Sequence, residues 1–270
     1  AIKYGYLTNF KIENMHEQFL ARQKQAKGLE KQAEAEEKKD SEFTYAAVDP
    51  EREYGFVAVA AGEGLKAVFG DLGVDAVVSG GQTMNPSTED ILAAIQSVPA
   101  KTVLVLPNNK NIIMASEQAQ KLADRKVIVV PTNTVPQGIS AMMAVDPEEA
   151  DPQVILAAMT EAAENVVTAQ VTYAARNSDF DGFAISAGDY LALTDGKLFG
   201  TDQKLETLLD QLAALAADKG AEFITVFYGD GVTQEDAQRA EQRFADACPE
   251  AEVSLLPGGQ PVYYYIISIE

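Results

Sequence analysis

Four short apolar runs, each followed at once by a polar loop, constrain the fold of this chain more than any other feature. The runs are rich in Val, Leu, Ile and Ala, and they occupy residues 56–60, 75–78, 102–106 and 127–130. Continuous runs of this kind are typical of strands that are buried on both faces of a parallel sheet. Because parallel strands end at the same edge of a sheet, the loops should lie together where open α/β sheets bind ligands.

Helical segments separate these strands. We expect helices over residues 65–72, 87–98 and 112–126, and a longer helix over residues 147–166 after Pro147. Residues 131–138 are predicted to be a loop. Alternating strands and helices favour right-handed crossovers, so residues 54–150 are predicted to form a parallel α/β lobe.

The second half of the chain follows a different pattern. An Asp-Gly turn at residues 195–196 predicts a β-hairpin. We expect helices over residues 205–217 and 235–248. Further strands are expected over residues 166–175, 182–198, 224–228, 253–256 and 263–269. Residues 151–270 are therefore predicted to be a mixed-sheet α/β lobe.

The first 53 residues differ from both lobes. Residues 1–15 contain one alternating run typical of a strand, and residues 16–53 are rich in Glu, Lys, Gln and Ala. We interpret the charged stretch as a solvated helical linker, with a self-associating helix as the alternative. Because the chain begins at Ala1 and not at Met, we interpret it as a fragment of a longer protein.

Composition excludes several classes of function. The formal net charge of −20 argues against nucleic-acid binding and against electrostatic docking on an anionic membrane. No apolar run approaches the roughly 18–20 residues that a membrane span requires. The simplest interpretation is a soluble cytoplasmic protein.

The residue types of common catalytic sites are scarce. Cys248 is the single cysteine and His16 the single histidine, and they lie in different segments. A nucleophilic Cys needs a nearby base, and a zinc site needs several Cys or His ligands. We therefore predict that Cys248 is structural and that the chain holds no metal.

Polar residues in the strand-end loops form the candidate ligand site. Hydroxyl side chains just before the helix at 87–98 lie where free backbone N–H groups favour an anion. The alternative is that they only cap the helix. The candidate set is Thr83, Asn85, Ser87, Thr88, Asn109, Lys110, Thr132 and Gln137.

Two glycine-rich segments and a tyrosine run have structural explanations. Residues 62–64 lack the Lys-Ser/Thr ending of a Walker loop, so they are a weak nucleotide signal. Residues 258–261 are predicted to be a turn. Residues 263–265 are three consecutive tyrosines that alternate across a strand, with core packing as the default and one ring exposed to a partner as the alternative.

Several long motifs resemble a known family. Residues 80–91, 106–111, 136–141 and 258–265 are similar to the C-terminal region of the fatty-acid kinase A subunit, also described as a dihydroxyacetone-kinase-like (DAK2-domain) protein. The resemblance covers nearly the whole chain. It implies a two-lobed DegV-like (EDD) α/β fold, which is the fold of the fatty-acid carrier subunit.

The resemblance also implies a bacterial parent with three parts and a role in phospholipid metabolism. A kinase domain that binds ATP and magnesium would precede this chain, and residues 1–15 would be the tail of a truncated middle domain. The fragment itself would then be no enzyme and need no cofactor. DegV-like carriers hold a fatty-acid carboxylate with hydroxyl residues of a Thr-Ser-Gln-Pro-Ser-like segment. Thr83, Pro86 and Ser87 match that pattern, whereas Met84 and Asn85 depart from it.

These implications give three competing functions. The first is a non-catalytic module that docks the DegV-like carrier, so that the missing kinase domain forms acyl phosphate. The second is a fatty-acid or small-molecule binding domain with a carboxylate or phosphate site at the strand-end loops. The third, an independent phosphatase or kinase, lacks the metal ligands and nucleophile that such chemistry needs.

Overall fold

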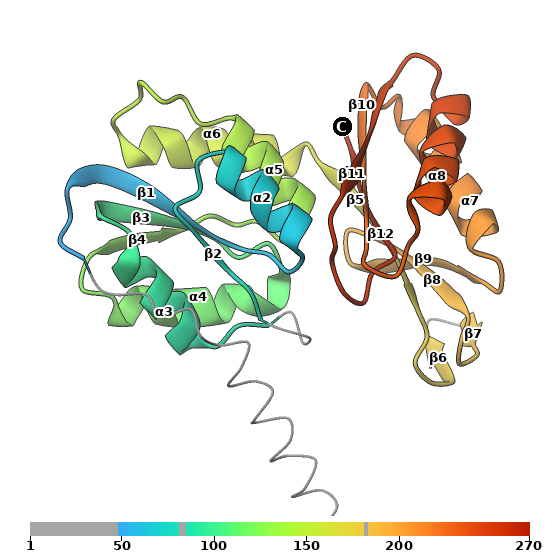
Figure 1. Ribbon diagram of the computed structural model, residues 1–270, viewed down its shortest axis with the longest axis horizontal. Helices are drawn as coiled ribbons and strands as arrows, with labels where there is room; N and C mark the ends of the chain where they lie inside the picture. The colour runs from blue at the N-terminus through green and yellow to red at the C-terminus, as the bar shows by residue number, and fades with distance from the viewer. Residues whose placement is uncertain (1–47, 81–84, 181–182) are drawn as a thin grey trace, which may run out of the picture. The chain divides into compact units, whose positions relative to one another are not determined.

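The computed structural model describes residues 48–80, 85–180 and 183–270 (Figure 1), and for residues 178–184 it gives no side-chain detail. The expected N-terminal strand and linker helix lie outside the described residues. Residues 45–270 form one compact unit. The mixed α/β architecture predicted for this part of the chain is confirmed.

The first lobe is built on a fully parallel four-stranded sheet. The strands are β1 (Arg52–Val59), β2 (Ala76–Val78), β3 (Ala100–Leu106) and β4 (Lys126–Val129), in the spatial order β2-β1-β3-β4. Each strand coincides with one of the four apolar runs. Their carboxyl ends therefore lie along one edge, as the sequence predicts.

Helices cover both faces of this sheet (Figure 1). Along β1, Val57 and Val59 pack with α3 (Thr88–Ser97) and α4 (Lys110–Leu122). Phe56 and Ala58 point to the other face. That face is covered by α2 (Glu63–Asp71), α5 (Val135–Met143) and α6 (Pro152–Glu164). Burial on both faces explains why the strands are continuously apolar.

The second lobe contains a six-stranded mixed sheet in the order β11-β10-β12-β5-β8-β9. Only β10 (Phe223–Tyr228) and β11 (Glu252–Pro257) are parallel; the other neighbours, β12 (Tyr265–Ile269), β5 (Val167–Tyr173), β8 (Tyr190–Thr194) and β9 (Lys197–Asp202), pair antiparallel. Helices α7 (Leu205–Lys219) and α8 (Gln234–Ala247) pack on one face. A small hairpin, β6 (Ser178–Phe180) and β7 (Phe183–Ile185), is separate from this sheet.

The two lobes share one hydrophobic core. Phe227 of β10 and Ile266 of β12, both nearly inaccessible to solvent, belong to the same cluster as the side chains of α2, α5 and α6. The Thr134 and Thr168 hydroxyls share a buried 2.7 Å hydrogen bond across the lobes. The face of the second sheet opposite α7 and α8 is therefore covered by the first lobe.

Several predicted boundaries are wrong for local reasons. Residues 131–138 are not all loop, because α5 begins at Val135, with the Thr134 hydroxyl as N-cap and a proline in the first turn. The helix expected from Pro147 begins at Pro152, where Asp151 supplies the cap. The expected Asp-Gly hairpin turn is present between β8 and β9.

Two further segments are shorter than expected. Helix α4 ends at Leu122, because Lys126 already belongs to β4. The last strand begins at Tyr265, so the two preceding tyrosines precede the strand and do not alternate across it. Both differences place polar or aromatic side chains in loops at the ends of the sheets.

Candidate functional site

The hydroxyl residues at the end of β2 act as helix caps in the structure. Ser87 and Asp90 form a capping box: the Ser87 hydroxyl accepts from the Asp90 amide, and the Asp90 carboxylate accepts from the Ser87 amide. Thr88 donates its hydroxyl to the Gln118 side chain, 3.3 Å away. Asn85 is exposed, and Thr83 lies outside the described residues. Ser87 therefore caps α3, as the alternative to ligand binding predicted.

The next loop positions Asn109 and Lys110 at the start of α4. Asn109 is the N-cap, and its side chain accepts from the Asn111 amide at 2.9 Å. Lys110 is exposed and reaches the β8–β9 turn of the second lobe. A Cβ atom built on Gly196 would lie 3.3 Å from the Lys110 Nζ. Lys110 is therefore a cation at the junction of the two lobes.

Asn108 is a buried residue in the loop that follows β3. Its backbone is left-handed, with φ of 54°, and its side-chain amide donates to the Val59 carbonyl at 3.0 Å. The Asn108 amide N–H donates to the hydroxyl of Thr132, which is fully buried. A Cβ on Gly138 would lie 2.1 Å from the Asn108 Oδ1. Asn108 thus connects the carboxyl ends of three strands, β1, β3 and β4, through buried hydrogen bonds.

The described members of the candidate set mostly bond to residues outside the set. The Gln137 side chain, for example, accepts from the Asn133 amide at 2.7 Å. A hydrogen bond to a neighbouring amide still leaves a hydroxyl or amide group with further bonding capacity. A ligand-binding role for these residues remains a prediction.

The two glycine-rich segments pack against each other. The Gly258 carbonyl accepts from the Leu65 amide at 3.1 Å, so it satisfies one N–H of the first turn of α2. A Cβ on Gly64 would lie 1.6 Å from the Pro257 carbonyl oxygen, and one on Gly62 would lie 2.4 Å from that of Gly258. Only glycine allows this approach. We call the contact of residues 62–64 with residues 257–260 the glycine contact.

Gln260 anchors the glycine contact from the second lobe. It is fully buried, and its side-chain amide donates to the Phe227 carbonyl at 3.0 Å. Sequence reasoning missed this role, because a single Gln in a glycine-rich turn is an ordinary surface residue. Its position after two glycines is the one signal that could have suggested it.

The remaining chemical groups are accounted for more simply. Cys248 is buried beside the Ala213 carbonyl, and burial raises the pKa of its thiol. Within the described ranges there is no group of three or more His, Cys, Asp or Glu side chains arranged to hold a metal ion. No helix in that part of the chain has the length and apolarity of a membrane span.

Three tyrosines gather at one end of the second sheet. The Tyr264 ring lies 6.1 Å from that of Tyr173 and 5.5 Å from that of Tyr190, between ring centroids. Burial, followed by the neighbouring Tyr190 and Tyr173, raises the pKa of Tyr264 above its ordinary value. Val262 lies in the adjacent turn and is 51% exposed. We call Tyr173, Tyr190, Val262 and Tyr264 the tyrosine edge.

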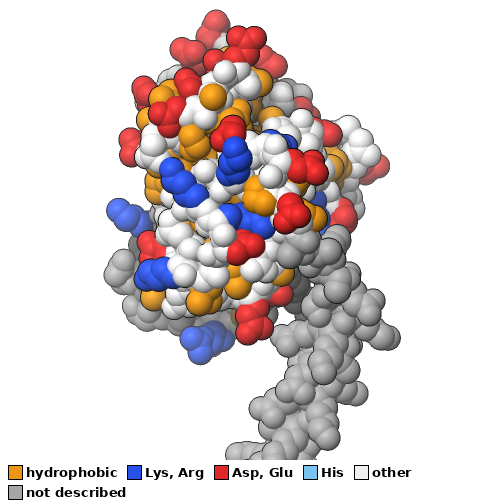
Figure 2. Space-filling model, turned by 90° about the vertical axis from the view of Figure 1, so that its left-hand side faces the viewer, with side chains coloured by type: hydrophobic (Ala, Val, Ile, Leu, Met, Phe, Trp, Pro, Cys, Tyr) orange, Lys and Arg blue, Asp and Glu red, His pale blue; other side chains and the backbone are white. Residues whose placement is uncertain are grey.

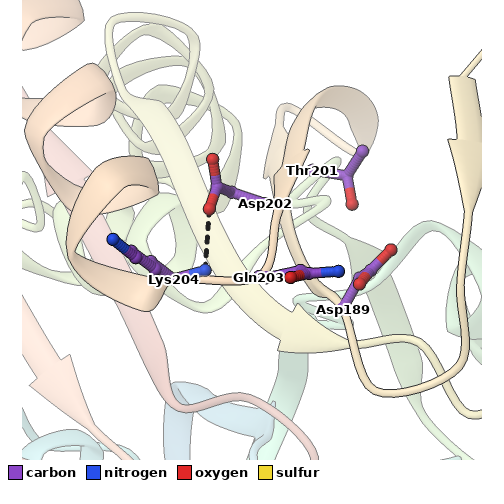
Figure 3. A pocket seen from close by; sticks show the side chains of 5 residues that line it. All are labelled: Asp189, Thr201, Asp202, Gln203 and Lys204. Atoms are coloured by element: carbon purple, nitrogen blue, oxygen red, sulfur yellow. Dashed lines mark hydrogen bonds between the residues drawn. The ribbon is translucent and has the colours of Figure 1, made fainter.

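An open hollow of about 400 Å³ lies at the start of β8, next to the tyrosine edge. Its lining side chains, drawn in Figure 3, are Asp189, Thr201, Asp202, Gln203 and Lys204. Figure 3 shows the Gln203 amide directed toward the Asp189 carboxylate, and the Lys204 ammonium on the far side of Asp202. We call these five residues the acidic hollow.

Comparison with known proteins identifies the family. Residues 55–270 match the family model for the C-terminal part of proteins like the A subunit of fatty acid kinase (FakA-like). The chain belongs to this family. It is also 39% identical over 267 residues to Protein YloV of Bacillus subtilis, an alignment that covers 99% of this chain and 46% of that protein. The chain thus spans about half the length of the curated relatives it matches.

Solved structures share the fold. The DegV family protein Cg2579 of Corynebacterium glutamicum superposes with a TM-score of 0.60 at 15% identity, covering 80% of this chain and 96% of that one. The Streptococcus pneumoniae fatty acid kinase B3 protein, loaded with linoleic acid, gives a TM-score of 0.54 at 10% identity, covering 81% and 99%. The expected two-lobed DegV-like fold is confirmed.

Proposed function

We propose that the chain docks a DegV-like fatty-acid carrier, as the non-catalytic C-terminal module of a bacterial fatty-acid kinase. The family match supports the link to the kinase, since the family is named for the A subunit of that enzyme. The chain covers 46% of a full-length relative, which leaves room there for the ATP- and magnesium-binding DAK2-type kinase domain. The cytoplasm, where ATP is available, is the proposed compartment.

The observation that carries the docking proposal is the glycine contact. In this family member the α2 N-terminus bonds to the Gly258 carbonyl of the other lobe, and Asn108 occupies the space beside Gly138. Polar groups at the strand ends are thus largely engaged in hydrogen bonds within the chain. A DegV-like fold whose strand-end polar groups bond within the fold itself is suited to binding another protein.

The test is direct binding. The purified chain is titrated with a DegV-like carrier from the same organism, loaded with a long-chain fatty acid, and the heat and the complex mass are measured. We expect a 1:1 complex and no acyl phosphate when ATP and magnesium are added. Acyl phosphate should form once the N-terminal half of the parent is supplied. The absence of a complex would contradict the docking proposal.

A second candidate function is fatty-acid or other anion binding at Thr83, Asn85, Ser87 and Lys110. It is favoured by one observation: a protein of the same fold is described as loaded with linoleic acid. Native mass spectrometry with long-chain fatty acids tests it. A stoichiometric adduct that disappears in Thr83→Ala plus Ser87→Ala would support ligand binding, and unchanged affinity in that variant would exclude this site.

A further inference from the structure

The tyrosine edge presents apolar surface that the described fold leaves uncovered. Tyr173 is 50% exposed and Val262 is 51% exposed, and Tyr264 packs behind them. Tyrosines on a rigid sheet end supply large contact area at little cost in conformational entropy, and they are enriched among residues that dominate protein interfaces.

Val262 adopts a backbone conformation that its residue type disfavours. Its φ is 70°, and the flanking Tyr263 amide donates to the Pro261 carbonyl at 2.7 Å, which closes a γ-turn. The Thr172 hydroxyl holds this turn by donating to the Val262 carbonyl at 2.8 Å. A β-branched residue at positive φ is a strained outlier, and glycine would adopt this turn without strain.

Burial does not explain why valine occupies this turn, since half of its side chain is in solvent. Strained conformations persist where the surrounding structure enforces them, and they concentrate at functional sites. The exposed Val262 side chain is therefore a feature that contributes little to folding and is available to a partner.

Carboxylates lie near two residues of the tyrosine edge, Tyr190 and Tyr264. Tyr190 follows Asp189 in the chain and pairs with Asp202 on β9, and both carboxylates line the acidic hollow. Asp230 precedes Gly231, and a Cβ built on Gly231 would lie 3.8 Å from the Tyr264 ring. The basic side chains in and next to these strands are Arg176, Lys197 at the opposite end of β9, and Lys204, which extends away from Asp189.

The charge of the whole lobe has the same sign. Residues 165–270, which follow α6, contain 17 Asp and Glu against 6 Lys and Arg, and residues 48–164 contain 16 against 7. Figure 2 views the molecule from the side of the first lobe, where Lys and Arg side chains lie among Asp and Glu. The net negative charge of the second lobe therefore favours a basic partner.

We infer that the tyrosine edge and the acidic hollow form one docking surface for a protein segment that places a Lys or Arg beside an apolar side chain. The cation enters the acidic hollow between Asp189 and Asp202, close to the Tyr190 ring. The apolar side chain covers Tyr173 and Val262. This inference rests on the proposed function, and the partner it assigns to the surface is the DegV-like carrier.

Charge excludes two other occupants of this surface. A second copy of the chain would bring an identical set of carboxylates against the first across a two-fold axis. An anionic lipid surface would be repelled in the same way. A basic protein surface is the occupant with complementary charge, and its binding should weaken as salt screens the carboxylates.

The test compares variants of the 270-residue chain in binding to the loaded carrier. Tyr173→Ala and Val262→Gly remove the apolar half of the surface; Asp189→Asn plus Asp202→Asn removes charge and keeps hydrogen-bond acceptors for the Ser186 and Lys204 amides. Phe223→Ala is the matched control, since Phe223 is 54% exposed on the same sheet.

We expect each apolar variant to weaken binding at least about tenfold, as removal of a central interface residue does. The double Asn variant should weaken binding and flatten its dependence on NaCl. Phe223→Ala should bind as the parent chain does. Val262→Gly should lose affinity while its urea midpoint stays equal or rises, a combination that a merely structural role does not produce.

Two outcomes overturn the inference while leaving the docking proposal intact. One is full affinity in Tyr173→Ala and Val262→Gly; the other is an equal loss in Phe223→Ala. If the parent chain binds no carrier at all, the docking proposal itself fails and the inference fails with it. If the variants instead abolish a dimer seen by analytical ultracentrifugation, the surface is a self-association interface and the inference is wrong.

Discussion

The strand ends of the first lobe and the tyrosine edge of the second lobe use their residues in opposite ways. The first region is polar in sequence, yet Ser87, Asn108 and Thr132 turn toward backbone groups of their own chain. The second region is aromatic and apolar, yet Tyr173 and Val262 face solvent. Residue polarity in the sequence therefore does not tell which of the two regions faces solvent; solvent exposure and backbone strain in the structure do.

The largest effect on stability is expected from a substitution in the glycine contact. Gly64→Ala places a Cβ 1.6 Å from the Pro257 carbonyl oxygen, so backbone must move, and we expect a loss of about 3 kcal/mol or more of unfolding free energy. Equilibrium urea unfolding measures it. Gly70→Ala, in the same helix with open space around it, is the control and should stabilise by roughly 0.5–1 kcal/mol. Equal effects of the two changes would mean that the glycine contact does not hold the lobes.

Asn108 tests whether the first region is structural. Asn108→Ala removes the buried bond to the Val59 carbonyl and leaves alanine at φ of 54°, so we expect a loss of about 2–3 kcal/mol. Asn109→Ala removes only an exposed cap and should cost about 1 kcal/mol. The two variants are compared by thermal and urea unfolding. A cost for Asn108→Ala no larger than that of its neighbour would argue against its role as an internal tie.

Alkaline pH probes the buried side of the tyrosine run. Burial, followed by the Asp236 carboxylate, raises the pKa of Tyr265 from 10.0 to about 12. Between these values the unfolded chain loses the proton and the folded chain keeps it, so stability falls as pH rises from about 10 to 12. The expected loss is on the order of 2 kcal/mol.

The measurement is the unfolding free energy in urea at about pH 9 and about pH 11.5, on either side of the unfolded-state pKa. Tyr265→Phe has no phenol to ionise, so its pH dependence should be smaller than that of the parent chain by this amount. A parent chain and a Tyr265→Phe variant with the same slope would contradict the assignment.

The smallest effect on stability is expected at the tyrosine edge. Val262→Gly relieves a positive φ but frees the unfolded chain, so the unfolding free energy should change by about 0 to +1 kcal/mol. Differential scanning calorimetry with the parent chain as reference resolves a change of this size. A clear destabilisation would show that the Val262 side chain supports the fold. Val262 would then be a structural residue, as Asn108 is.

The sequence predicted the parallel sheet because burial on both faces leaves an unbroken apolar run, as in residues 102–106. It also located the β8–β9 turn through Asp195-Gly196. It missed α5, since the polar and proline residues before Val135 are as typical of a loop as of a helix start. Local pattern does not separate these two cases when the cap and the first turn use the same residues.

The candidate site was harder to predict than the fold. Residues 62–64 and 258–260 each suggested only a turn, and their mutual contact depends on two segments almost 200 positions apart in the printed sequence. Ser87 and Asn109 were identified as polar residues at strand ends, which is correct in position. Whether they also bind a ligand stays a prediction, because a capping group and an anion-binding group have the same sequence pattern.

The shared core of the two lobes has a consequence for dissecting this protein. Phe227 and Ile266 complete a cluster built mainly from α2, α5 and α6. A chain cut in the segment before α6 would leave each half with a bare apolar face, so neither half should survive as a soluble fragment. Split reporters and domain swaps between relatives should therefore keep residues 45–270 together, and limited proteolysis should leave this unit uncut.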